Sequence, residues 1–310
     1  MSTQAPRAVV LIRPRHFFPN PATAADNTFQ SSADDRDPNA LAASAFAEVT
    51  AAAERLEEFG VTVHLFEDDS AEHPDSVFPN NWFSTHSGGH IAIYPMHSPS
   101  RRGERRGDII ELLKRRYRVQ DVVDYSGLEY DDVFLEGTGA MVLDHASRVA
   151  YTVRSNRANP VALERFCTNF GYEPMVFDAT DASGRPIYHT NVLMGIATDF
   201  AMVGLSTIAD ERRRAEIVDR LSADGRMVID LTPAQVSDFA GNAIELRGRE
   251  GRILAISSRG LASLDAVQIA AIEQSCTIAP LSVPTIELAG GSVRCMIAGI
   301  HLDARPTEIR

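Results

Sequence analysis

The sequence has little of what marks a secreted or membrane-spanning protein. Its three cysteines, Cys167, Cys276 and Cys295, are an odd number without paired spacing, so no disulfide framework is implied and a reducing compartment is expected. No apolar run approaches the roughly 20 residues of a membrane-spanning helix, and the apolar stretch 9–12 is too short for a signal peptide. We therefore expect a cytoplasmic protein that does not enter a membrane.

Positive charge is scarce as well. The chain has 30 Lys and Arg residues against 42 Asp and Glu residues, which gives a net charge of −12 and a pI near 5.2. This balance is unfavourable for binding nucleic acid or an anionic membrane surface. A glycine-rich phosphate loop and a Gly-x-Ser-x-Gly nucleophile elbow are also absent. The expected partner is a small molecule, with no organic cofactor, and the sequence leaves open whether the chain forms a homo-oligomer.

One pair of histidines has a spacing that a zinc site can use. His86 and His90 are four residues apart, but Gly88 and Gly89 between them are typical of a hairpin turn and not of one helical face. We therefore expect no metal centre. The basic run 101–106 is able to bind an anionic ligand, although such a run is more often a solvated face that leads into a helix.

What the chain does have is a long repeat. Five polar residues, each followed by a short apolar run, recur at intervals of 55, 53, 53 and 53 residues: Asn81, Glu136, His189, Asn242 and Cys295. A repeat of this length is one supersecondary unit, and units arranged in a ring bring equivalent positions to a common axis. An acid, a histidine and a cysteine that are far apart in sequence then converge, as in an enzyme.

Secondary-structure patterns recur with the same period. Helical patterns cover residues 41–59, 107–117, 160–170, 210–221 and 264–276. Apolar or β-branched runs follow these helices at 61–66, 119–123, 175–177, 227–229 and 278–283, and others follow the polar residues, such as 149–153, 201–205 and 253–256. Each unit therefore consists of strand, strand, helix and strand. We predict a five-bladed α/β propeller that forms one domain over residues 1–310, with strand 9–12 closing the ring against the last unit.

Residues 16–37 do not fit this repeat. The segment contains prolines, asparagines and small residues without periodicity, so we predict a long loop. Loops of this length are often lids or binding loops, and a mobile surface segment is the alternative.

Cys295 is the candidate nucleophile. A lone cysteine in an apolar strand, as expected here, is usually a small core residue, and a thiol needs a cation or a base nearby to become nucleophilic. The position of Cys295 in the repeat, together with His189 and Glu136, favours catalysis. Inside a dry channel we expect Glu136 to have a raised pKa and to orient His189. Cys167 and Cys276 lie in helical patterns and are expected to be structural.

Three motifs resemble those of the guanidine-modifying, or pentein, superfamily, which includes arginine deiminase and dimethylargininase. Segment 290–296 is similar to its Gly-Gly-x-x-x-Cys motif, His189-x-Asn191 to its His-x-Asp motif, and Glu136-Gly137 to its Glu-Gly motif. The resemblance covers nearly the whole chain. It implies a five-bladed α/β propeller in which Cys295 is the nucleophile, His189 the general acid and base, and Glu136 its carboxylate partner.

Two positions depart from the members that cleave guanidines. Those carry aspartates where this chain has Asn191 and Asn81. Losing one charge pair at about 4 Å costs on the order of 4 kcal/mol at an effective dielectric near 20, so neutral amides make a poor cation site. An amide matches a neutral ureido group donor for acceptor. The segments 11–14 and 77–82 also look most like the citrulline ureidase branch.

Other polar residues are expected to bind substrate. Segment 151–157 is similar to the Ser-x-Arg substrate segment of the family, which implies that Arg157 binds the substrate α-carboxylate, with Arg154 as the alternative. The alternative interpretation is that both are surface arginines that follow a strand. Asn242, in a segment like the family's Gly-x-Asn strand start, is expected to line the channel.

The leading hypothesis is hydrolysis of L-citrulline to L-ornithine, carbon dioxide and ammonia through a carbamoyl thioester on Cys295, with Asn81 and Asn191 positioning the ureido group. The first alternative is a guanidino hydrolase of the arginine deiminase or dimethylargininase type, in which Asp131 and Asp132 supply the missing charge. The second is a non-catalytic pentein that serves as a binding module.

Overall fold

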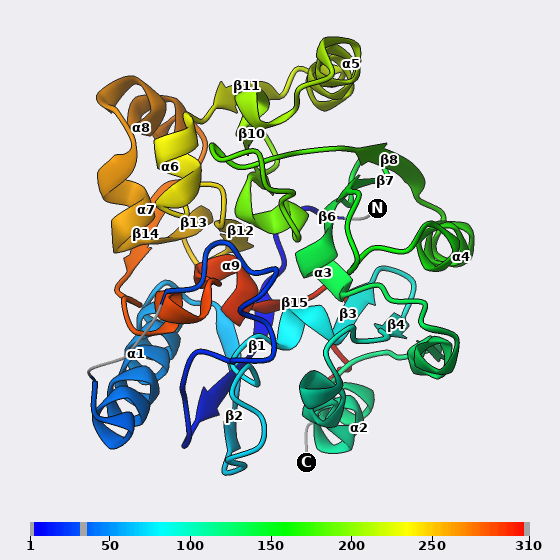
Figure 1. The fold of residues 1–310 in the computed structure, drawn as a ribbon, viewed down its shortest axis with the longest axis vertical. Helices are drawn as coiled ribbons and strands as arrows, with labels where there is room; N and C mark the ends of the chain where they lie inside the picture. The colour runs from blue at the N-terminus through cyan, green and yellow to red at the C-terminus, as the bar shows by residue number, and fades with distance from the viewer. Residues whose placement is uncertain (1–2, 32–35, 307–310) are drawn as a thin grey trace.

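The computed structural model describes residues 3–31 and 36–306. Fifteen strands form five separate sheets of three strands each, and the sheets are arranged as blades around one centre with most of the longer helices outside them (Figure 1). This arrangement confirms the predicted five-bladed α/β propeller. The ring places the start of each inner strand near the common axis, which is where the five polar residues of the repeat lie.

The five blades share one strand pattern. Along the chain they are β3 (Phe83–His86), β4 (His90–Ile93) and β5 (Asp121–Asp124); β6 (Met141–Asp144), β7 (Val149–Val153) and β8 (Glu173–Phe177); β9 (Met194–Ile196), β10 (Phe200–Val203) and β11 (Met227–Asp230); β12 (Ile244–Arg247), β13 (Arg252–Ser257) and β14 (Thr277–Leu281); and β15 (Ala298–Ile300), β1 (Ala8–Pro14) and β2 (Thr62–Asp68). In every blade the middle strand pairs antiparallel with the inner strand and parallel with the outer strand. A parallel neighbour requires a crossover, and a helical segment supplies it.

The last blade joins the two ends of the described chain. β1 pairs with β15, with Ala8 opposite Ile300 and Val10 opposite Ala298. The prediction that strand 9–12 closes the ring against the last unit is therefore confirmed. Closure leaves no gap between the first and last blades, so the apolar faces of all five sheets are covered by neighbours.

The crossover helices begin and end at local sequence signals. They are α1 (Pro38–Glu58), α2 (Gly107–Arg116), α4 (Pro160–Phe170), α5 (Glu211–Ser222), α7 (Ser258–Ser263) and α8 (Ala266–Glu273). α4 begins after Asn159, whose side chain accepts from the Val161 amide, and ends at Gly171 with φ 65°. The predicted helix 264–276 is shorter because Asp265 caps a new helix, α8, after α7 has ended.

Four of the five repeated polar residues lie in or directly before short helical turns, and not in strands. These turns are η1 (Pro79–Asn81), α3 (Gly137–Ala140), η4 (Thr190–Val192) and α9 (Val293–Met296); the others in the fold are η2 (Pro99–Glu104), η3 (Ser126–Asp131), η5 (Leu205–Thr207), α6 (Pro233–Ser237) and η6 (Ile286–Ala289). Cys295 was expected in a strand, and that expectation is wrong. Gly290 turns the backbone at φ 80°, and the amide of Cys295 donates to the Ser292 carbonyl at 3.0 Å, which forms the turn α9.

The hairpin expected between His86 and His90 is confirmed, since the two residues pair across β3 and β4, with Gly88 and Gly89 at φ 91° and 93°. No helix within the described parts of the chain is long and apolar enough to cross a bilayer.

Candidate active site

A small cavity of about 20 Å³ lies where the inner ends of the blades meet, which is room for about one water molecule. Its walls come from distant parts of the chain: Thr23, Asn27, Asp75, Phe78, Asn81, Arg101, Arg157, Tyr188, His189, Ala289, Gly291 and Cys295. Asn81, His189 and Cys295 belong to three different repeats. These three positions converge on one cavity, as predicted.

His189 and Glu136 form a buried pair. Nε2 of His189 lies 2.9 Å from Oε2 of Glu136, and both side chains are almost completely buried. The backbone amide of His97 donates to the other carboxylate oxygen at 3.0 Å. Both oxygens of Glu136 are thus held, so its carboxylate fixes the orientation of the imidazole.

The protonation of this pair differs from the expectation. Burial alone would raise the pKa of Glu136, but Arg157, His189 and Arg101 outweigh it and hold that pKa well below its usual value. The predicted raised pKa of Glu136 is wrong, because two arginines beside it were not foreseen. Burial lowers the pKa of His189 despite the opposing effect of Glu136, so its imidazole is neutral at neutral pH and able to accept a proton.

Two amide side chains contact the sulfur of Cys295. The Nδ2 groups of Asn191 and Asn242 each donate to Sγ at 3.2 Å. The sequence placed Asn191 on the substrate and Asn242 along the channel, whereas neither side chain lines the cavity, and both lie against the nucleophile. Asn81 does line the cavity, as expected.

Arg157 reaches the cavity and Arg154 does not. Arg157 is 2% exposed and donates to Glu136 at 3.1 Å and to Asp26 at 2.6 Å, and its guanidinium lies 4.9 Å from the ring centre of Tyr188. Arg154 is exposed and pairs with Asp178 at 3.2 Å. Of the two candidates for a carboxylate-binding arginine, only Arg157 is placed for that role.

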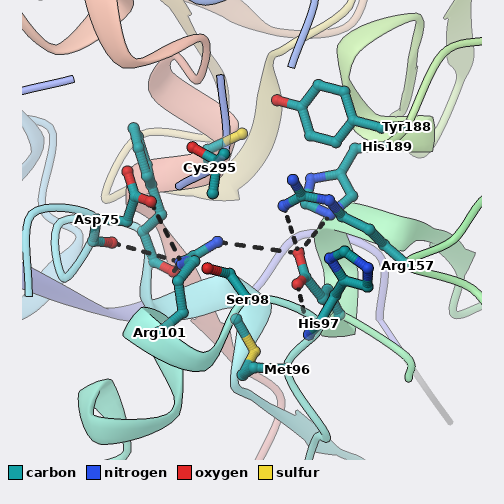
Figure 2. A network of polar contacts seen from close by, with 12 residues as sticks. Asp75, Met96, His97, Ser98, Arg101, Arg157, Tyr188, His189 and Cys295 are labelled. Carbon is teal, nitrogen blue, oxygen red and sulfur yellow. Dashed lines mark hydrogen bonds and ion pairs between the residues drawn. The ribbon is translucent and has the colours of Figure 1, made fainter. Parts of the chain in front are cut away.

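Sequence reasoning missed Arg101. Its side chain was expected on a solvated face, which is wrong, since Arg101 is 3% exposed and its guanidinium donates to Glu104 at 2.8 Å. Figure 2 shows Arg101 and Arg157 approaching the same centre from opposite sides, with His189 beside Arg157 and Cys295 above the two arginines. The turn η2, which contains Arg101, directs this side chain inward. A basic run gives no periodic signal that distinguishes this one arginine.

Asp75 was also missed. Its carboxylate lines the cavity, lies 3.7 Å from Arg101 and accepts from Asn20 at 2.8 Å. The cavity wall therefore carries a carboxylate that the sequence analysis did not identify. Asp131 and Asp132, considered as a source of negative charge, are exposed and do not line the cavity.

The loop predicted over residues 16–37 covers the site in its described part. Thr23 and Asn27 line the cavity, and Nδ2 of Asn27 donates to the Ala289 carbonyl at 2.9 Å. Asp26 of the same loop pairs with Arg157. Residues 32–35 of this prediction lie outside the described residues. Within the described part, residues 23–27 form part of the wall of the site.

Gly139 allows the site to close. A Cβ atom at this position would lie 2.3 Å from the side-chain amide of Asn81 and 2.9 Å from the ring of His189. Only glycine therefore permits Asn81 and His189 to approach each other across α3. Among the described residues no group of three or more His, Cys, Asp and Glu side chains is arranged to hold a metal ion.

Five three-stranded blades around a cavity that joins a cysteine, a histidine and a glutamate define a pentein of the guanidine-modifying superfamily. The family model described as N,N dimethylarginine dimethylhydrolase, eukaryotic, matches residues 13–302, and the chain belongs to this family. It is accordingly a hydrolase that acts on C–N bonds, and not the non-catalytic binding module considered as an alternative.

Solved structures share the fold. A ternary complex of AgrE with ornithine and NAD+ gives a TM-score of 0.74 at 16% identity, covering 98% of this chain and 40% of AgrE. The substrate-bound N-terminal domain of ArgZ, a cyanobacterial arginine dihydrolase, gives 0.72 at 14% identity, covering 94% of this chain and 97% of that domain. A dimethylarginine dimethylaminohydrolase in adduct with S-methyl-L-thiocitrulline gives 0.63 at 14% identity, covering 97% and 100%. At these identities the likeness shows the fold alone. No curated protein matches the sequence.

Proposed function

We propose that the protein hydrolyses the ureido group of L-citrulline to give L-ornithine, carbon dioxide and ammonia. The observation that carries the proposal is the set of side chains around the sulfur. The groups that contact Sγ of Cys295 are the neutral amides of Asn191 and Asn242, and Asn81 adds a third amide to the cavity wall. Asn81 offers an amide donor and acceptor to a ureido group, and none of the three amides supplies a countercharge to a guanidinium.

The charges of the cavity wall support the same substrate class. Two arginines, Arg101 and Arg157, line the cavity against one aspartate, Asp75, whose charge is already balanced by Arg101. Arg157 is paired with Asp26 and Glu136, so the wall holds no unpaired carboxylate for a cationic side-chain group. The α-carboxylate of an amino acid is attracted, and Arg157 is the group to bind it in place of Asp26. Because the cavity has room for about one water molecule, the loop that carries Asp26 moves when substrate binds.

The chemistry follows from the buried pair. Cys295 gives its thiol proton to His189, and the sulfur attacks the ureido carbon. The bond from this carbon to the δ-nitrogen breaks as His189 returns the proton to that nitrogen, so ornithine leaves and a carbamoyl thioester remains on Cys295. Water that gives a proton to His189 then attacks the thioester, the C–S bond breaks, and the sulfur recovers the proton. The carbamic acid that is released decomposes to carbon dioxide and ammonia.

A second candidate, a guanidino hydrolase acting on arginine or methylated arginine, is favoured by one observation. Asp75 places a carboxylate in the cavity wall, 3.7 Å from Arg101. If Arg101 moved away on binding, the charge of Asp75 would become free for a guanidinium. Asn191 and Asn242 argue against this candidate, since neither bears a negative charge beside the sulfur.

Assays of citrulline, arginine and dimethylarginine at equal concentration decide between the candidates. We expect ornithine release from citrulline with a kcat/KM at least tenfold above that for either cation, and no release by Cys295→Ala. Faster turnover of a cation would reject the citrulline proposal. Under the guanidino alternative Asp75→Asn loses the cation activity selectively, so the ratio of citrulline to arginine turnover rises, whereas under our proposal this ratio stays within twofold of the wild type.

A further inference from the structure

A neutral substrate leaves one chemical requirement unmet. A thiol with an ordinary pKa near 8.5 is mostly protonated at neutral pH, and the thiolate is the nucleophile. A guanidinium substrate would bring its own positive charge to the sulfur, but a ureido group does not. His189 is neutral in the free enzyme, because burial lowers its pKa. The protein itself must then supply the groups that stabilise a negative sulfur.

Asn242 is fixed as a donor to the sulfur. Its Oδ1 accepts from the backbone amides of Arg294 at 3.0 Å and Cys295 at 3.3 Å. Its Nδ2 donates to the Asn191 carbonyl at 2.9 Å and to Sγ at 3.2 Å. If this amide were flipped, its oxygen would face another acceptor, the Asn191 carbonyl. Its NH₂ group would face two other donors, the backbone amides of Arg294 and Cys295. Asn242 therefore presents an N–H to Sγ, and never an acceptor for a thiol proton.

Asn191 provides the second donor. Its Nδ2 also donates to Sγ at 3.2 Å, and its backbone carbonyl is held by Asn242. Both side chains are completely buried, so the two N–H groups act where water does not screen them. A sulfur that faces two donors must accept both hydrogen bonds, and a thiolate accepts them more strongly than a thiol.

We propose that Asn191 and Asn242 are catalytic residues that stabilise the thiolate of Cys295 as it forms, so that activation of the nucleophile is built into the protein. The S–H bond breaks, the proton passes to His189, and Glu136 stabilises the imidazolium at 2.9 Å. The reason for the arrangement rests on the proposed function, because only a neutral substrate requires it. The contacts with sulfur do not depend on it.

The test measures the sulfur without any substrate. The rate of alkylation by iodoacetamide, a neutral reagent, is followed from pH 5 to pH 10 in the full-length protein. Asn242→Ser and Asn191→Ser should each raise the midpoint by about one pH unit, a tenfold loss of thiolate at a given pH. Asn191→Asp, which has the same shape but places a carboxylate against the sulfur, should raise it further.

Asn81→Ser is the matched control, because it removes an amide from the same cavity that makes no hydrogen bond to the sulfur in the described structure. Its midpoint should equal that of the wild type. Unchanged midpoints in both serine variants would overturn the proposal. Should one variant not fold, the other still decides. If the midpoints shift as expected but citrulline is not hydrolysed, the proposed substrate is rejected and the proposed role of Asn191 and Asn242 is retained.

Discussion

Nη1 of Arg101 lies 2.7 Å from the side-chain oxygen of Asn81, in the amide orientation that also lets Asn81 donate to Asn80 at 3.0 Å. A charged guanidinium in the cavity wall is thus paired with a neutral oxygen. Guanidine-cleaving relatives were expected to carry an aspartate at this position. Residue 81 therefore adds no negative charge to those of Glu104 and Asp75 beside Arg101.

Substituting Asn81→Asp should change the substrate preference. A carboxylate at this position neutralises Arg101 and lowers the potential against a cation by an interaction on the order of 4 kcal/mol before solvent correction. We expect the ratio of kcat/KM for citrulline to that for arginine to fall at least tenfold. Asp131→Asn, at an exposed position, is the control and should leave the ratio within twofold. An unchanged ratio in Asn81→Asp would show that residue 81 does not set the preference.

Glu136→Gln should lower kcat by about 100-fold, within the range that acid–base groups contribute. The amide keeps the shape but loses the charge that stabilises the imidazolium of His189. The carboxylate of Glu136 raises the pKa of His189 against burial, so its loss lowers that pKa further. The acid limb of kcat/KM, where protonated His189 is inactive, should therefore move to lower pH. A drop in kcat with an unmoved acid limb would mean that Glu136 acts only on stability.

The two candidate arginines provide a matched pair. Arg157→Lys removes the planar fork that suits a carboxylate, so KM for citrulline should rise at least tenfold while kcat changes less. Arg154→Lys, at an exposed position paired with Asp178, should keep both constants within twofold. Steady-state kinetics measures both. Equal effects of the two substitutions would remove Arg157 from the substrate site.

Gly139→Ala tests how closely the site is packed. The added Cβ would lie 2.3 Å from Asn81 and 2.9 Å from the His189 ring, so one of these side chains must move. We expect kcat to fall about 100-fold with a loss of roughly 1–3 kcal/mol in unfolding free energy, typical of overpacking. Gly127→Ala, which meets no atom within 4 Å, should change neither quantity beyond about 0.5 kcal/mol and twofold. Activity near wild type in Gly139→Ala would contradict the described geometry.

Acid should weaken the fold through buried histidines. Burial, with the charge of Arg294, lowers the pKa of His301 to about 4, against 6.5 for an unperturbed histidine. Between these values the unfolded chain binds a proton that the folded protein does not, so stability falls as the pH decreases. The slope reaches at most about 1.4 kcal/mol per pH unit for this residue. Urea unfolding from pH 7 to pH 4 measures it.

The histidine variants make this pH dependence specific. Burial also lowers the pKa values of His86 and His145, so other groups contribute to the total slope. His301→Gln should reduce the slope between pH 6.5 and pH 4, and the exposed His16→Gln is the control expected to keep the wild-type slope. An identical slope in all three proteins would exclude His301 as a titrating group.

Local sequence signals predicted the elements of the fold. The cap at Asn159, the proline after it and the glycine at 171 place α4 at residues 160–170, where the structure has it. These signals act within a few residues and need no distant contact. The repeat of five polar residues then predicted the ring, because a unit of about 53 residues can only bury its apolar faces against copies of itself.

Distant contacts decided what local signals did not determine. Arg101 belongs to a basic run like those on solvated surfaces, and it is buried because Glu104 and Asp75 surround it. Asn191 was assigned to the substrate from its motif, yet its amide donates to the sulfur of a residue 104 positions away. The neighbouring residues do not determine where the side chains of Arg101 and Asn191 point, because this depends on how separate blades meet.

By itself the sequence determined the five-fold repeat, the helices and strands of each unit, and the cysteine, histidine and glutamate that meet at its centre. Periodicity and capping are local properties of the sequence. In a ring of repeated units, equivalent residues occupy equivalent positions around the common axis. Only the tertiary structure decided the charges of the cavity and the partners of Cys295. A side chain's ionisation and hydrogen bonds depend on groups within a few ångströms, and here those groups come from other blades and from the loop that carries Asp26.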